Sequence, residues 1–171
     1  MKRYIKNAIS PYSSLAGMSD DERVALSKNP NASIEQLMAL IEEPDDTRLG
    51  EAIISNAVDT IALHKDATPE ILRKIYPETD LVLQNPNCPL DILEEYADFC
   101  DDYHMYNIVC NPNAPAYLLH NFMENCTSEL DNMIAAHPNT SVEDLKDYIN
   151  YGGYLGNIAK ENLAKRGIKY E

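Results

Sequence analysis

Apolar side chains recur along this chain at fixed distances from a short polar turn. Five ungapped segments share the pattern: 26–41, 61–76, 82–97, 108–123 and 134–149. As the anchor of each segment we take the residue that ends its Asn-Pro-Asn or equivalent turn, namely Asn31, Asp66, Asn87, Asn113 and Asn139. An aliphatic residue lies five positions before every anchor, a leucine six positions after it and a large apolar residue nine positions after it. Such repetition predicts a repeat architecture.

The spacing after each anchor predicts a helix, because positions six and nine are three apart and share one helix face. Ser33, Thr68 and Ser141 stand where an N-cap oxygen can accept a backbone N–H from the start of that helix. Pro69 suits the first helical position, and we expect Pro89 and Pro115 to do a similar job. The aliphatic residue before each anchor is expected to end a second, shorter helical stretch.

One such unit cannot bury its apolar stripe alone, so several must stack into a continuous core. The expected fold class is all-α, a right-handed α-solenoid of about five full helical repeats plus degenerate terminal caps. We expect one domain over 1–171, with caps at 1–25 and 150–171 and repeats at 26–149. The first two anchors are 35 residues apart, which predicts an insertion near 42–56. Near the C-terminal end, Ile158–Glu161 echoes Ile134–His137.

These units resemble the leucine-rich repeat variant family, whose signature is an N-P-N-x-(S/T/P) turn followed by a helix with regularly spaced leucines. The resemblance covers roughly 26–149 and extends less well to the ends. It implies alternating α and 3₁₀ helices in a right-handed superhelix. Some family members carry a cysteine-rich iron–sulfur segment. That cysteine cluster is absent from this sequence, so an iron–sulfur site is not expected here.

The remaining residues with reactive or metal-binding side chains favour structural roles. His64 and His137 share a repeat position with Asn29, Asn85 and Asn111, and both residue types can donate and accept hydrogen bonds in a turn. His104 and His120 are expected to be isolated surface residues. Cys88, Cys100, Cys110 and Cys126 form no C-x-x-C pair, so we expect reduced, packed thiols. No nucleotide-binding, metalloprotease or nucleophile motif is present, so we expect no enzyme activity, metal or cofactor.

Charge is distributed unevenly along the chain, which has a formal net charge of −14. Residues 75–145 contain thirteen acidic side chains and no lysine or arginine, whereas both ends are basic. The acidic balance argues against direct binding to nucleic acid or to an anionic membrane surface. No stretch is long and apolar enough for a transmembrane helix, and no signal peptide is apparent. These features predict a cytoplasmic protein.

The acidic middle provides the strongest functional hypothesis, a non-enzymatic module that binds a basic protein surface. The predicted partner-binding residues are Glu94, Glu95, Asp98, Asp101, Asp102, Glu124, Glu129 and Asp131. The last six are expected at or after helix ends, where the helix dipole does not stabilise a carboxylate. A sharper form of the hypothesis is an inhibitor of phage type that mimics nucleic acid and occupies a nucleic-acid-binding channel. The alternative is a structural scaffold or assembly factor whose acidity serves solubility only.

Overall fold

The computed structural model describes residues 15–42, 47–98, 101–124 and 127–170, and every regular element in these ranges is helical. This confirms the all-α class. In chain order the elements are α1 (Asp20–Ser27), α2 (Ile34–Glu42), α3 (Arg48–Ala62), α4 (Pro69–Ile75), the 3₁₀ helices η2 (Tyr76–Glu78) and η3 (Asp80–Gln84), α5 (Leu90–Ala97), α6 (Asp102–Val109), α7 (Ala116–Phe122), α8 (Ser128–Ala136), α9 (Val142–Tyr151) and α10 (Gly153–Lys165).

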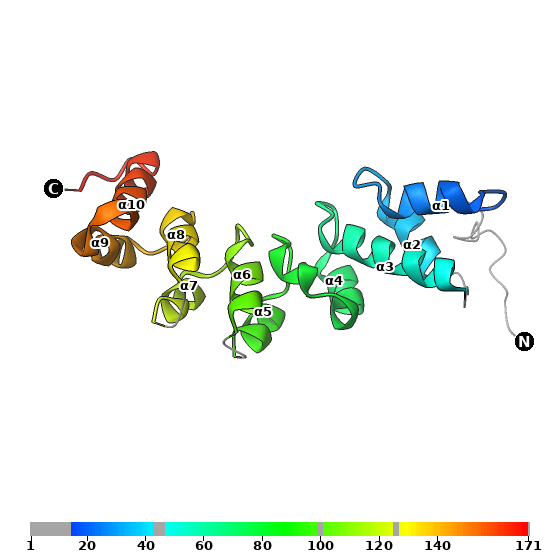
Figure 1. Ribbon diagram of the computed structural model, residues 1–171, viewed down its shortest axis with the longest axis horizontal. Coiled ribbons are helices and arrows are strands. Elements are labelled where there is room, and N and C mark those ends of the chain that lie inside the picture. The colour runs from blue at the N-terminus through cyan, green and yellow to red at the C-terminus, as the bar shows by residue number, and fades with distance from the viewer. Residues whose placement is uncertain (1–14, 43–46, 99–100, 125–126, 171) are drawn as a thin grey trace, which may run out of the picture.

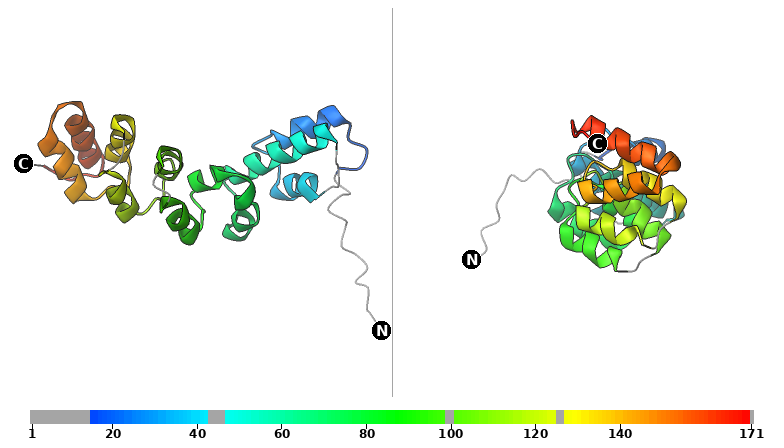
Figure 2. Two further views of the ribbon diagram at one scale, coloured as in Figure 1. Left: turned by 60° about the horizontal axis from the view of Figure 1, so that its bottom comes forward. Right: turned by 90° about the vertical axis from the view of Figure 1, so that its left-hand side faces the viewer.

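From α1 to α9 the helices follow one another in chain order along the long axis of the molecule, and α10 packs beside α9 (Figure 1). Each polar turn joins a pre-turn helix (α1, α3, η3, α6 or α8) to a post-turn helix (α2, α4, α5, α7 or α9). Along the pre-turn row, α1 packs against α3, α3 against η3, η3 against α6, α6 against α8, and α8 against α10. The left view of Figure 2 shows the same succession, and in the right view, along the long axis, the helices lie one behind another. Of the described pre-turn helices, η3 alone is a 3₁₀ helix, so the alternation that the family resemblance implies occurs at one turn.

The post-turn helices begin at the predicted caps. The Thr68 hydroxyl accepts the N–H of Ile71, and the Ser141 hydroxyl accepts the N–H of Asp144 at 3.0 Å. Ser33 does the same for Gln36 at 3.2 Å. Pro89 and Pro115 differ from the prediction, since they occupy the N-cap position itself and provide no side-chain hydrogen bond. They hold the repeat position of Thr68, one residue before that of Pro69.

The repeated apolar positions form the core. The leucines six positions after the anchors are all at most 3% exposed: Leu37, Leu72, Leu93, Leu119 and Leu145. Four of the aliphatic residues five positions before the anchors are completely buried: Ile61, Val82, Ile108 and Ile134. Full burial of one such side chain contributes about 1.5–3 kcal/mol, so these two positions supply much of the driving force for stacking.

The turns are tied to one another by a ladder of buried polar side chains. The Nδ2 of Asn111 donates to the carbonyl oxygens of Leu83 and Asn85, at 2.9 and 2.7 Å. His137 continues the ladder, because its Nδ1 accepts the N–H of Asn139 and its Nε2 donates to the Asn111 carbonyl at 2.8 Å. Asn85 repeats the Asn111 bonds one turn earlier, to the carbonyls of Ala62 and His64. His64 accepts the N–H of Asp66 as His137 accepts that of Asn139, but its Nε2 donates to the carbonyl of Ala32, three positions further along the preceding turn. The structural role predicted for the Asn/His position is therefore confirmed.

The C-terminal end continues this ladder in a register that the sequence analysis missed. Asn162 of α10 donates from Nδ2 to the carbonyls of Ala135 and His137, at 2.7 and 2.9 Å. The similarity of Ile158–Glu161 to Ile134–His137 predicts that Glu161 corresponds to His137. In the structure, Asn162, the next residue, makes the ladder hydrogen bonds instead. Arg166 donates to the carbonyls of Thr140 and His137, at 2.6 and 2.8 Å, and ends the ladder.

The ladder places the five polar turns side by side along one edge of the molecule. We call this edge, which holds the anchors and the Asn/His positions, the turn edge. Because each helix crosses from one side of its layer to the other, the post-turn helices end, and the next pre-turn helices begin, on the opposite side. We call that side the connecting edge. Of the insertion predicted near 42–56, residues 43–46 lie outside the described residues, and the part from Arg48 forms the first turns of the 15-residue helix α3.

Candidate functional site

The predicted acidic residues belong to two neighbouring layers and concentrate at the connecting edge. Asp98, Asp101 and Asp102 flank the α5–α6 connection. Glu124 and Glu129 flank the α7–α8 connection. These five side chains are exposed, as are Glu94 and Glu95 on α5, whereas Asp131 on α8 is partly buried. Contacts of α6 with α8 hold the two connections in neighbouring layers.

Four of these acids lie at helix N-termini, where a carboxylate stabilises the helix, contrary to the prediction. Asp101 is the N-cap of α6, and its carboxylate accepts the N–H of His104 at 2.8 Å, which lowers the pKa of Asp101. Asp102 lies in the first turn of α6, and Glu129 and Asp131 lie in the first turn of α8. A carboxylate at a helix N-terminus is stabilised by the helix dipole. The expectation that these four gain nothing from the dipole was wrong.

His104 is also less isolated than predicted. Its side chain is 19% exposed, and its Nδ1 lies 2.5 Å from Asp101 Oδ2. Its Nε2 lies 3.6 Å from Asp80 Oδ2, and its ring stacks at a tilt on Tyr96 with the ring centroids 4.9 Å apart. His120 is exposed as predicted but hydrogen-bonds to the buried Asp144. Both histidines therefore connect elements rather than standing free on the surface.

Asp98 and Glu124 remain without a structural explanation. Both lie eleven positions after their anchors, Asp98 as the C-cap of α5 and Glu124 directly after the C-cap of α7. A negative charge is unfavourable at the C-terminal end of a helix. The same repeat position in the first segment holds Glu42, whose carboxylate lies 2.7 Å from Lys74 Nζ. Among the described residues, neither Asp98 nor Glu124 forms an ion pair with a lysine or arginine, although Glu124, after Asp144, helps to raise the pKa of His120.

Polar pairs also join consecutive post-turn helices and account for further acidic residues. Arg73 of α4 and Asp91 of α5 form a bidentate pair at 2.6 Å. The Tyr117 hydroxyl of α7 donates to Glu94 of α5. In the next layer His120 of α7 pairs with Asp144 of α9 at 2.7 Å. Glu94 is therefore partly explained as an interlayer contact.

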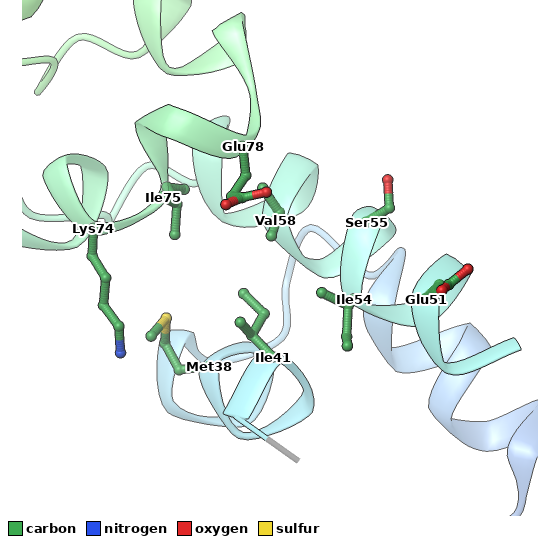
Figure 3. Close-up of a pocket in the computed structure, with 9 residues that line it drawn as sticks. All are labelled: Met38, Ile41, Glu51, Ile54, Ser55, Val58, Lys74, Ile75 and Glu78. Carbon is green, nitrogen blue, oxygen red and sulfur yellow. The ribbon is translucent and has the colours of Figure 1, made fainter. Parts of the chain in front are cut away.

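A groove at the N-terminal end of the connecting edge was not predicted. Aliphatic side chains from three helices converge on this open space of about 520 Å³, and Figure 3 shows them facing one another: Met38, Ile41, Ile54, Val58 and Ile75. Lys74, Glu51 and Glu78 lie at its rim. Each aliphatic residue is also a plausible core residue in sequence, so only their meeting in space reveals the groove.

The described cysteines and histidines do not gather into a metal site. No group of three or more metal-ligating side chains occurs in the part of the chain that the structure describes. Cys88 and Cys110 are partly buried free thiols, and burial raises the pKa of Cys88 to about 12. Such a thiol is inert as a nucleophile at neutral pH. Cys100 and Cys126 lie outside the described residues.

Comparisons with protein-family models, with curated proteins and with solved structures give no match for this chain. Within the described ranges, no helix has the length and apolar character needed to cross a membrane. The connecting edge, which carries the unexplained acids and the groove, is the candidate site.

Proposed function

We propose that this protein is an interaction module that binds a basic protein surface through its connecting edge. The observation that carries the proposal is the placement of Asp98 and Glu124, which occupy dipole-unfavourable helix ends in two neighbouring layers and form no ion pair with a lysine or arginine among the described residues. Retaining charges that cost stability is reasonable where a partner supplies the missing cations. A basic surface would also relieve the repulsion among the thirteen acids at 75–145.

The proposed frame for this edge is a right-handed α-solenoid of about five repeats with terminal caps, of the leucine-rich repeat variant type. Its support comes from the ladder of Asn and His side chains that links each turn to the one before it. A ladder of this kind fixes the step from one layer to the next. The acids of successive layers are then presented at a fixed spacing, which favours recognition of an extended basic surface over a single basic residue.

We further propose that the partner is a nucleic-acid-binding protein whose basic channel this edge occupies. Carboxylates held at regular spacing on a rigid frame can stand in for phosphates, because both present anionic oxygens to lysine and arginine. The absence of lysine and arginine between Lys74 and Lys146 supports this form of the proposal. The chain would then act as an inhibitor by excluding nucleic acid from the channel.

A capture experiment tests this function. The immobilised protein is incubated with lysate of its source cells at ~0.1 M and ~0.5 M salt, and retained proteins are identified by mass spectrometry. We expect basic nucleic-acid-binding proteins at low salt, their loss at high salt, and their displacement by added duplex DNA. Retention of acidic proteins, or capture that survives both high salt and DNA, would contradict the proposal and favour the scaffold alternative.

Matched variants locate the binding edge. Asp98→Asn with Glu124→Gln removes two charges from the connecting edge, whereas Glu70→Gln with Glu143→Gln removes two from first helical turns at the turn edge. Both pairs change the net charge equally. We expect the first pair to reduce capture about tenfold and the second to leave it within about twofold. Equal losses would show that only overall charge matters.

A further inference from the structure

The groove of Figure 3 has a counterpart at the other end of the connecting edge. This second groove, of about 580 Å³, is lined by residues of α8, α9 and the start of α10, together with Met123 just after α7. Six of its positions coincide with those of the first groove when both are counted from their anchors. The matched pairs are Ile41 and Met123, Ser55 and Ser128, Val58 and Asp131, Lys74 and Asp147, Ile75 and Tyr148, and Glu78 and Tyr151. We call the two the N-terminal and the C-terminal groove.

The two grooves differ in chemistry at two of the matched positions. Where the N-terminal groove has aliphatic Val58 and cationic Lys74, the C-terminal groove has carboxylates at Asp131 and Asp147. Its lining contains no lysine or arginine. Asp131 is oriented by the Tyr148 hydroxyl, which donates to its Oδ1 at 2.8 Å. The C-terminal groove is therefore anionic.

Two tyrosines at the C-terminal groove are unusually exposed. Tyr151 is 85% exposed and Tyr154 is 75% exposed, which are the highest values among the large apolar side chains of the described residues. They flank Gly152 and Gly153, whose φ angles of 83° and 63° turn the chain sharply from α9 into α10. Apolar rings left in water beside a groove are typical of a binding surface.

From these observations, and resting on the proposed function, we propose that the C-terminal groove binds an arginine side chain of the basic partner. The rings of Tyr151 and Tyr154 offer faces to a planar cation, and Asp131 and Asp147 offer carboxylate oxygens. Arginine suits this combination better than lysine, since its guanidinium is planar, stacks on aromatic rings and donates in a fork to carboxylates. The N-terminal groove lacks this combination, because its matched positions hold Val58, Lys74 and Glu78 in place of Asp131, Asp147 and Tyr151.

The test uses a defined probe and the full chain. A blocked peptide with two arginines separated by glycine is titrated into protein labelled on its tyrosine rings, and resonances are followed by NMR. Matched peptides carry lysine or the neutral arginine analogue citrulline. We expect the signals of Tyr151 and Tyr154 to shift first, with the arginine peptide binding about threefold more tightly than lysine and about tenfold more tightly than citrulline.

Variants separate the groove from general acidity. Tyr151→Ala with Tyr154→Ala should weaken the arginine peptide about tenfold, whereas the two Phe replacements keep the rings and should change it less than about twofold. Asp147→Asn should also weaken it. Tyr103→Ala, an exposed tyrosine of α6, serves as the control and should have no effect. Both groove tyrosines are exposed, so unchanged melting temperatures are expected throughout.

Three results would overturn the inference: equal binding of arginine and citrulline peptides, shifts spread over all exposed tyrosines, or unchanged affinity in the double Ala variant. These failures are distinguishable from a failure of the proposed function. If the peptide does not bind while the Asp98/Glu124 variant still loses its partner, only the groove assignment falls. If the peptide binds but that variant keeps its partner, the acids at the α5 and α7 ends are not the contact surface.

Discussion

Polar residues have different roles on the turn edge and on the connecting edge of the molecule. On the turn edge, Asn85, Asn111 and His137 are buried and each satisfies carbonyl groups of the preceding turn. On the connecting edge, Asp98 and Glu124 are exposed and stand at helix ends that disfavour them. Polar groups on the first edge therefore hold the layers together, whereas these two acids on the second do not stabilise the fold.

This contrast separates stability from recognition within one repeat. The same segment supplies a structural residue two positions before its anchor and an acid eleven positions after it. Substitutions at the first position should change unfolding and leave the binding surface intact. Substitutions of the acid eleven positions after the anchor should weaken binding and leave unfolding unchanged.

The largest effect is expected from Asn111→Leu. The leucine leaves the carbonyls of Leu83 and Asn85 and the N–H of Asn113 without partners in a buried place. Each unsatisfied buried group costs about 1–3 kcal/mol, so the free energy of unfolding should fall by about 3 kcal/mol or more. Urea unfolding monitored by circular dichroism measures this loss.

Asn111→His is the matched control, because His64 and His137 occupy the same repeat position. A histidine restores a donor to the preceding turn and an acceptor for the N–H of Asn113. We expect it to lose less than half of what the leucine variant loses. If the leucine and histidine variants are equally destabilised, the shape of the side chain at position 111 determines stability, and its hydrogen bonds to the neighbouring turn do not.

A pH dependence is expected from the turn edge. Burial, reinforced by Arg166, lowers the pKa of His137 below its ordinary value near 6.5. The unfolded chain therefore takes up a proton before the folded chain does, and stability should fall as the pH drops below about 6.5. His137→Asn should flatten this acid limb in urea midpoints measured from pH 5 to 7.5. If the urea midpoint of the variant still falls with pH as in the wild type, groups other than His137 cause the acid sensitivity.

The opposite pH dependence is expected between two post-turn helices. The hydrogen bond to Asp144 raises the pKa of His120, so the pair is fully formed below the ordinary histidine pKa and is lost as the pH rises through the raised value. The wild-type protein should therefore lose a small amount of stability as the pH rises, and His120→Gln should abolish this loss. Urea midpoints from pH 6 to 8.5 show it, and a wild-type midpoint that does not fall in this range would contradict the assignment.

Much of the fold could be predicted because its signals are local and repeated. The leucine after each anchor, the Ser or Thr cap and the polar turn each occur within a few residues, and agreement among five copies fixed their meaning. The C-terminal register was missed because Asn162 lies inside α10 and follows no Asn-Pro-Asn turn. Its role depends on carbonyls of the preceding turn, which spacing along the chain does not reveal.

The candidate site was predicted less well, because the caps at the starts of the pre-turn helices were not recognised. Ser19, Asp101 and Thr127 each lie twelve positions before an anchor and begin α1, α6 and α8. Asp101 was interpreted as surface charge although it begins α6 as an N-cap. The two grooves were missed for a different reason. Their walls come from residues of separate helices, and Met38 or Tyr148 looks like an ordinary core residue when each is considered alone.

The most direct test of the division between edges is the affinity for a purified basic partner, measured by calorimetry alongside melting temperature. For Asp98→Asn with Glu124→Gln, we predict a dissociation constant about tenfold higher and a melting temperature that is equal or higher by about 1–3 °C, because two dipole-unfavourable charges are gone. For Glu70→Gln with Glu143→Gln, we predict unchanged affinity and slightly lower stability. Unchanged affinity in the first variant, or a fall in its melting temperature, would contradict the account.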